Sequence, residues 1–250
     1  MLFIALGTFC RREAALSKDD KLPQTTAEAF ALASSMDASL KEKLATYREH
    51  SSRLRPEVAA VYQKLVDHLE ALVSGAAAPA VGDRMPDFLL PDQHGQLVSL
   101  ENLLASGPVV VSMNRGHWCP YCKLDLRALA RSEPEIRRLG AQLVSIMPEK
   151  AQYTKRAIAE NDFPFPILTD VDLSYALSLG LIFWIGADMK KLYDDLGLDL
   201  AVFQGNRSYF LPIASKFVVG RDGLVKAREI NLNFRERMEP TAIIAALEKL

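Results

Sequence analysis

Two cysteines three positions apart are the residues of this sequence best suited to do chemistry. Cys119 and Cys122 lie in the segment 115–122, which reads Arg-Gly-His-Trp-Cys-Pro-Tyr-Cys. The segment directly follows a β-branched run at 109–111 that is typical of a buried strand, and a helix is expected from about 120 to 139. Cys119 therefore lies between the end of the expected strand and the first residue of the expected helix. The unpaired N–H groups and the dipole of a helix start favour the thiolate form of a cysteine at that position.

The spacing gives the two sulfurs different roles. Cys122 lies one helical turn beyond Cys119, so a disulfide between them can close locally. We expect Cys119, the more N-terminal and more exposed of the two, to attack, and Cys122 to resolve. Pro120 suits a first helical position because its missing N–H would be unpaired there anyway. A zinc half-site that includes His117, or a pair of inert core thiols, remains an alternative, although the sequence holds no second C-x-x-C.

The neighbours of the cysteines support or surround this site. Arg115 and Lys123 can add positive potential, and His117 could act as a general acid, although we expect a solvent-facing histidine without a catalytic role. Trp118 is expected either to pack in the core or to form a docking surface beside the disulfide. Cys10 is expected to be a bystander.

The composition excludes several other classes of protein. The 250 residues include 30 basic and 31 acidic side chains, and this balance argues against a dedicated nucleic-acid binder. No run of apolar residues is long enough to predict a membrane span, and three cysteines are too few for a disulfide scaffold. The apolar start of the chain lacks the preceding basic residues of a secretory signal, so we expect a cytoplasmic protein.

Helical patterns come before an α/β pattern along the chain. After an irregular N-terminus at 1–24, a capping box and an apolar stripe of helical period predict two or three amphipathic helices over 25–75. From residue 80 to 250 the order βαβα followed by ββα predicts a mixed central sheet flanked by helices. We expect the helical extension to pack on this second domain. An arm that forms a homodimer is the alternative.

Two groups of residues resemble a known family. Residues 81–88 (VGDRMPDF), together with 92–95 and 98–100, are similar to the opening of peroxiredoxins of the alkyl hydroperoxide reductase/thiol-specific antioxidant type. Residues 115–122 resemble the Arg-Gly-x-Trp-Cys-Pro-Tyr-Cys signature of a bacterial peroxiredoxin-like branch. The resemblance covers roughly residues 40–250. It implies a thioredoxin-like fold and reduction of peroxides through a cysteine thiolate, with no metal or organic cofactor.

Several positions depart from the pattern of that family. Typical members carry a proline seven residues and a threonine three residues before the reactive cysteine, where this sequence has Ser112 and Gly116. An arginine of a later strand and the cis-proline of the fold both align with Ala214. Pro212 lies two residues too early, so either the loop shifts and Pro212 is the cis-proline, or the cis-proline is absent and Pro212 is an ordinary trans proline. Arg115 or the backbone N–H groups of the helix start would then have to stabilise the departing peroxide oxygen.

These observations lead to one main hypothesis and two alternatives. In the main hypothesis, the Cys119 thiolate reduces hydrogen peroxide or an organic hydroperoxide, and Cys122 condenses with the oxidised sulfur to a disulfide. An external dithiol, of the thioredoxin or glutaredoxin type, then reduces that disulfide. The alternatives are a thiol–disulfide oxidoreductase that acts on protein disulfides and a non-enzymatic redox sensor.

Overall fold

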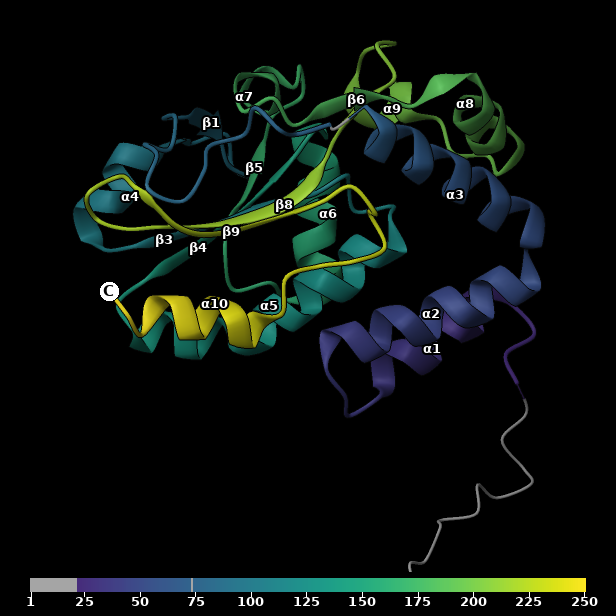
Figure 1. Cartoon of the computed structure of the whole chain (residues 1–250), viewed down its shortest axis with the longest axis horizontal. Helices are drawn as coiled ribbons and strands as arrows, with labels where there is room; N and C mark the ends of the chain where they lie inside the picture. The colour runs from purple at the N-terminus through teal and green to yellow at the C-terminus, as the bar shows by residue number, and fades with distance from the viewer. Residues whose placement is uncertain (1–21, 73) are drawn as a thin grey trace, which may run out of the picture.

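A five-stranded mixed sheet forms the centre of the protein (Figure 1). The computed structural model describes residues 22–72 and 74–250, so Cys10 and most of the segment 1–24 lie outside the described residues. The strand order is β5-β4-β3-β8-β9. β3 is parallel to β4 and antiparallel to β8, while β5 is parallel to β4 and β9 antiparallel to β8. The mixed sheet expected from the sequence is confirmed. Its strands are β3 (Val109–Met113), β4 (Gln142–Met147), β5 (Ile167–Thr169), β8 (Ala214–Val219) and β9 (Val225–Asn231).

Shorter elements connect the strands of this sheet. Two antiparallel pairs, β1–β2 and β6–β7, lie outside the central sheet. The segment 171–212 reads in the sequence as one helix with an irregular stretch, but it holds five elements. Apart from α8, which has ten residues, each is too short for its periodicity to be recognised. The short elements are β1 (Leu89–Pro91), β2 (Leu97–Ser99), α4 (Leu100–Ser106), α7 (Ser174–Ser178), β6 (Ile182–Trp184), α8 (Gly186–Asp195), α9 (Leu200–Gln204) and β7 (Phe210–Pro212).

Helices cover both faces of the sheet. On one face, α5 (Pro120–Arg138), α6 (Ala151–Asn161) and α10 (Pro240–Leu247) pack with the side chain of Val110. The other face, which carries Val109 and Val111, packs with the β1–β2 pair, α4 and α7. All three valines are fully buried, as the β-branched run predicts.

The N-terminal extension forms three helices. They are α1 (Thr26–Ser35), α2 (Leu40–Leu54) and α3 (Pro56–Ala71). The side chain of Thr25 accepts a hydrogen bond from the N–H of Glu28 at the start of α1, which confirms the predicted N-cap. Figure 1 shows α2 beside the start of α5, while α3 runs towards α8. None of the helices in residues 22–72 and 74–250 is long and apolar enough to cross a membrane.

Specific contacts attach the extension to the α/β part of the chain. Tyr47 of α2 packs edge-on against Tyr121 of α5, with ring centroids 5.1 Å apart. The carboxylate of Glu239 accepts hydrogen bonds from the backbone N–H groups of Leu40 (3.3 Å) and Lys41 (2.5 Å) at the start of α2. A carboxylate at this position caps unpaired N–H groups and interacts favourably with the helix dipole. The extension therefore packs on the α/β part as expected, while its assignment as a separate unit over 25–75 stays a prediction.

Candidate active site

The two cysteines lie at the start of α5, directly after β3. Cys119 has extended backbone angles (φ −82°, ψ 118°) and is the N-cap residue, and Pro120 occupies the first helical position. Cys122 follows within the first turn. Both thiols are free and buried, with 2% of Cys119 and none of Cys122 exposed. The structure therefore places Cys119 where the sequence predicts it, at the junction of strand and helix.

The surroundings of the two cysteines shift their pKa values in opposite directions. Burial raises the pKa of Cys119, but a hydrogen bond from the Cys122 thiol and the positive charges of Arg115 and Arg237 outweigh it and lower this pKa to about 6. Burial raises the pKa of Cys122 well above its usual value, and the hydrogen bond to Cys119 and the charge on Cys119 raise it further. Cys119 is therefore the thiolate at neutral pH, and Cys122 keeps its proton.

Arg115 carries a buried positive charge beside Cys119. It is only 1% exposed, and its Nη2 donates a hydrogen bond to the hydroxyl of Tyr193 in α8. Its guanidinium carbon lies 3.9 Å from the ring centroid of Phe234 and 5.4 Å from that of Trp118. Contacts with aromatic faces stabilise a cation that has lost its water. The structure thus places Arg115 beside Cys119, held by residues that the sequence did not identify.

Arg237 is a second buried arginine, and it contacts the other cysteine. Its Nη2 lies 3.3 Å from the sulfur of Cys122, and its Nη1 donates to the backbone carbonyls of Phe234 (2.5 Å) and Glu236 (2.6 Å). Its Nε lies 3.4 Å from a carboxylate oxygen of Asp125. Sequence reasoning missed Arg237. The absence of an arginine at position 214 was the one signal that another arginine had to act near the cysteines.

A buried ion pair lies beyond Arg237. Asp125 of α5 accepts a hydrogen bond from Lys216 of β8 at 2.5 Å, and each side chain is only 1% exposed. The amino group of Lys216 also donates to the carbonyl of Met238 (3.1 Å). Charges buried this deeply are costly unless they are paired, so the pair and Arg237 hold one another in place. The contacts Cys122–Arg237–Asp125–Lys216 thus link the sulfur of Cys122 to the central sheet.

His117 is turned away from the cysteines. Its backbone N–H and its ring Nδ1 each lie 2.8 Å from a carboxylate oxygen of Glu149, which is fully buried. Its ring stacks on Tyr153, with centroids 5.6 Å apart, and meets the ring of Phe203 edge-on. Only 12% of the His117 side chain is exposed, so the expectation of a solvent-facing histidine is wrong. Among the described residues, no group of three or more His, Cys, Asp or Glu side chains is placed to hold a metal ion, so the structure does not bring His117 and the two cysteines together as a zinc half-site.

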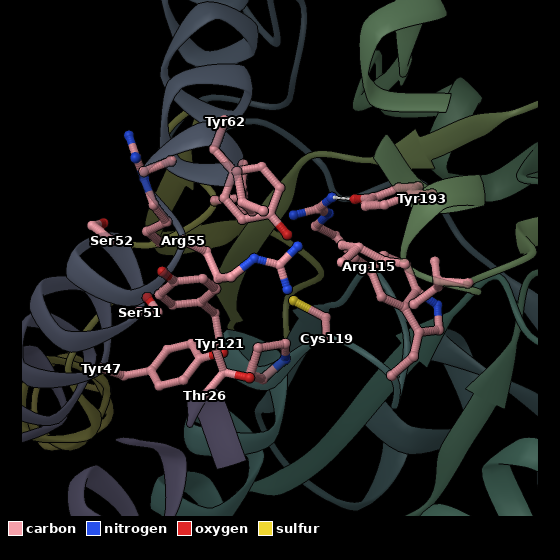
Figure 2. Close-up of a pocket in the computed structure, with 18 residues that line it drawn as sticks. Thr26, Tyr47, Ser51, Ser52, Arg55, Tyr62, Arg115, Cys119, Tyr121 and Tyr193 are labelled. Carbon is pink, nitrogen blue, oxygen red and sulfur yellow. Dashed lines mark hydrogen bonds between the residues drawn. The ribbon is translucent and has the colours of Figure 1, made fainter. Parts of the chain in front are cut away.

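A cavity of about 200 Å³ opens beside Cys119 (Figure 2). Figure 2 shows the sulfur of Cys119 pointing into it, while Tyr62 and Tyr47 project from the extension. Trp118 is half-buried in the wall of the cavity and packs edge-on against Tyr193. The aromatic side chains of the wall are Tyr47, Tyr62, Trp118, Tyr121, Tyr193 and Phe234.

Comparison with known proteins places this geometry in a family. The model of the AhpC/TSA family matches residues 81–228. The chain belongs to the AhpC/TSA family. Two Mycobacterium tuberculosis proteins with provisional peroxiredoxin names are 31% identical to it over 103 residues, which is 40% of this chain and 65% of each relative. The match therefore spans slightly less than two thirds of the length of these relatives.

Solved structures of the same kind share the fold. The crystal structure of peroxidoxin BcpB from Mycobacterium tuberculosis has a TM-score of 0.54 at 20% identity, over 69% of this chain and 98% of that chain. A cysteine-to-serine mutant of peroxiredoxin 6 from Arenicola marina has a TM-score of 0.53 at 14% identity, over 68% and 72% of the two chains. The thioredoxin-like fold expected from the sequence is confirmed.

The departures of this chain from other AhpC/TSA proteins have structural reasons. Gly116 has a φ of 145°, and a Cβ added there would lie 2.4 Å from the ring nitrogen of Trp118 and 2.9 Å from Glu149. A threonine therefore does not fit at this position while Trp118 keeps its place. The hydroxyl of Ser112 is buried inside β3 and accepts a hydrogen bond from Asn114 (2.9 Å), which a proline could not do.

Pro212 is a trans proline in this AhpC/TSA protein. The described residues contain no cis peptide bond, so of the two alternatives for Pro212 the structure has the ordinary trans proline and not the shifted cis-proline. Pro212 ends β7, where it pairs with Ile182, and it is absent from the wall of the cavity.

Proposed function

We propose that this protein is a thiol-dependent peroxidase. The Cys119 thiolate attacks one oxygen of a hydroperoxide, an S–O bond forms, and the O–O bond breaks. The leaving oxygen takes the electron pair and a proton and departs as water or an alcohol. The thiol of Cys122 then displaces water from the sulfenic acid of Cys119 and forms a disulfide. Two thiols of an external dithiol protein, of the thioredoxin or glutaredoxin type, reduce this disulfide by exchange.

One observation carries this proposal: a sulfur whose pKa is lowered to about 6 points into a small cavity. The thiolate, not the thiol, is the nucleophile that reacts with peroxides. The second sulfur is in hydrogen-bond contact with the first, so the oxidised product can be trapped as a disulfide without a large movement. Membership of the AhpC/TSA family also supports a thiol-dependent peroxidase.

The burial of Cys119 favours a small substrate over a protein disulfide. Only 2% of the residue is exposed, and a cavity of about 200 Å³ admits a small molecule but not a folded protein. The extension forms part of the wall above it. A protein disulfide could reach this sulfur only if the extension moved away, whereas a hydroperoxide can enter the cavity without such a movement.

The aromatic wall predicts a preference among hydroperoxides. An apolar group on the substrate can replace water against the six aromatic side chains of the cavity, which hydrogen peroxide cannot do. We expect reduced protein to react with cumene hydroperoxide at least about 10-fold faster than with hydrogen peroxide, since about 1.4 kcal/mol of apolar contact corresponds to that factor. Stopped-flow measurement of both rate constants, with insulin reduction as the assay for the oxidoreductase alternative, tests this. Slow reaction with both peroxides together with fast insulin reduction would reject the peroxidase proposal.

A further inference from the structure

The helical extension brings a tyrosine hydroxyl to the reactive sulfur. Tyr62 lies in the middle of α3, outside the residues 81–228 that match the family model. It lines the same cavity as Cys119, and Figure 2 shows its hydroxyl directed towards Cys119 and Arg115 from above. Its ring packs edge-on against Phe234, with centroids 5.1 Å apart and the planes at 86°. No hydrogen bond from this hydroxyl to another described residue is present, although the hydroxyl of Tyr193 on the opposite side is held by Arg115.

The reaction of a peroxide with Cys119 needs a hydrogen-bond donor near the oxygen that leaves. When a thiolate attacks a peroxide, negative charge develops on the oxygen that leaves, and preorganised donors lower the barrier by stabilising it. Lowering the thiol pKa alone raises the reaction rate only slightly, because the nucleophilicity of the thiolate falls as its pKa falls. Of the three positions at which the sequence departs from the family pattern, Gly116 and Ala214 carry no polar side-chain atoms, and the hydroxyl of Ser112 is buried inside β3, where it bonds to Asn114. The donors must therefore come from elsewhere in the wall.

We propose that Tyr62 is a catalytic residue, whose hydroxyl donates a hydrogen bond to the leaving oxygen of the hydroperoxide. This inference rests on the proposed peroxidase function and extends the active site into the N-terminal helices. In the step, the sulfur of Cys119 gains the near oxygen and is oxidised, while the far oxygen takes the electron pair of the broken O–O bond. The hydroxyl of Tyr62 stabilises that charge until a proton from water completes the alcohol or water product.

The electrostatics of the cavity keep Tyr62 in the required form. Burial raises the pKa of Tyr62 well above its usual value, Tyr193 and Cys119 raise it further, and Arg115 opposes them. The hydroxyl therefore stays protonated at neutral pH and is available as a donor. The position of the ring is also fixed, because Phe234 packs edge-on against it and carries Arg115 on its face. A donor held in this way needs no reorganisation when charge develops.

The variant Tyr62→Phe removes the hydroxyl and keeps the ring that packs on Phe234. We expect the rate constant of Cys119 with a hydroperoxide to fall about 100-fold, at the lower end of the range found when one preorganised donor is removed from an active site. Alkylation of Cys119 by iodoacetamide should stay within about twofold of the wild type, because iodide leaves without a hydrogen-bond donor. Tyr209→Phe is the matched control. It removes a tyrosine hydroxyl outside the cavity that makes no hydrogen bond in the described structure, and both of its rates should equal those of the wild type.

Other outcomes would overturn the inference. If Tyr62→Phe reacts with peroxide as fast as the wild type, Tyr62 is not a donor. If its peroxide and alkylation rates fall by the same factor, Tyr62 acts only through the thiolate or the fold. Failure of the proposed function itself is distinguishable, because the wild type would then react slowly with peroxide while it is still alkylated rapidly at neutral pH.

Discussion

Replacement of Cys119 by serine should abolish peroxide consumption, whereas replacement of Cys122 by serine should leave exactly one turnover per molecule of reduced protein. The reason is that the pKa values of the two thiols are shifted in opposite directions. Cys119 is ionised at neutral pH, while the pKa of Cys122 is raised well above its usual value, so Cys122 cannot take over the attack. Without Cys122, the described residues hold no other cysteine that could condense with the sulfenic acid of Cys119, so we expect this acid to accumulate.

Stopped-flow consumption of peroxide and mass spectrometry after trapping with dimedone measure the two outcomes. Cys10→Ser is the control, and we expect it to behave as the wild type. A Cys119→Ser variant that keeps its full rate would reverse the roles of the sulfurs. Repeated turnover by Cys122→Ser with a dithiol protein as the reductant would show that the internal disulfide is not part of the cycle.

Replacement of Arg115 by methionine should raise the pKa of Cys119 and slow its reaction at neutral pH. Methionine keeps an apolar side chain between Phe234 and Trp118 but removes the charge that stabilises the thiolate. A neighbouring opposite charge typically lowers such a pKa by about 1–3 units. With a pKa of about 6, about nine-tenths of Cys119 is ionised at pH 7, and a rise of two units would leave about one-tenth.

Alkylation of Cys119 at a series of pH values measures this change directly. The expected fall in the alkylation rate at pH 7 is up to about 10-fold, and the loss should recover as the pH rises through the new pKa. Arg138→Met is the control, because Arg138 is an exposed residue at the far end of α5. An unchanged pH profile in Arg115→Met would show that Arg115 does not stabilise the thiolate. Circular dichroism separates this effect from a loss of the fold.

The part of the site that depends on local sequence could be predicted. The β-branched run at 109–111 and the proline at position 120 define the end of a strand and the start of a helix, so the placement of Cys119 followed from neighbours in the chain. The spacing of Cys122 likewise needs only one helical turn. The three N-terminal helices were predictable for the same reason, because capping residues and helical periodicity are local signals.

The rest of the site is assembled by tertiary contacts that no local pattern reveals. Arg237 lies 115 positions after Cys122 and reaches it from an irregular segment, and Tyr62 comes from a helix of the extension. Their types alone gave no signal, since buried and exposed arginines or tyrosines look alike in a sequence. His117 was misjudged because its partner Glu149 is 32 positions away, so its burial depends on how the following strand and helix pack.

The pH dependence of Cys119 in the reduced wild-type protein tests the central claim most directly. Iodoacetamide alkylation at a series of pH values, with mass spectrometry to identify the modified cysteine, gives the pKa of each thiol separately. The structure predicts that alkylation of Cys119 rises with pH through a midpoint of about 6, while Cys122 stays unreactive in that range. A midpoint for Cys119 near about 8.5, the value of a free cysteine, would contradict a thiolate held ready at the start of this helix.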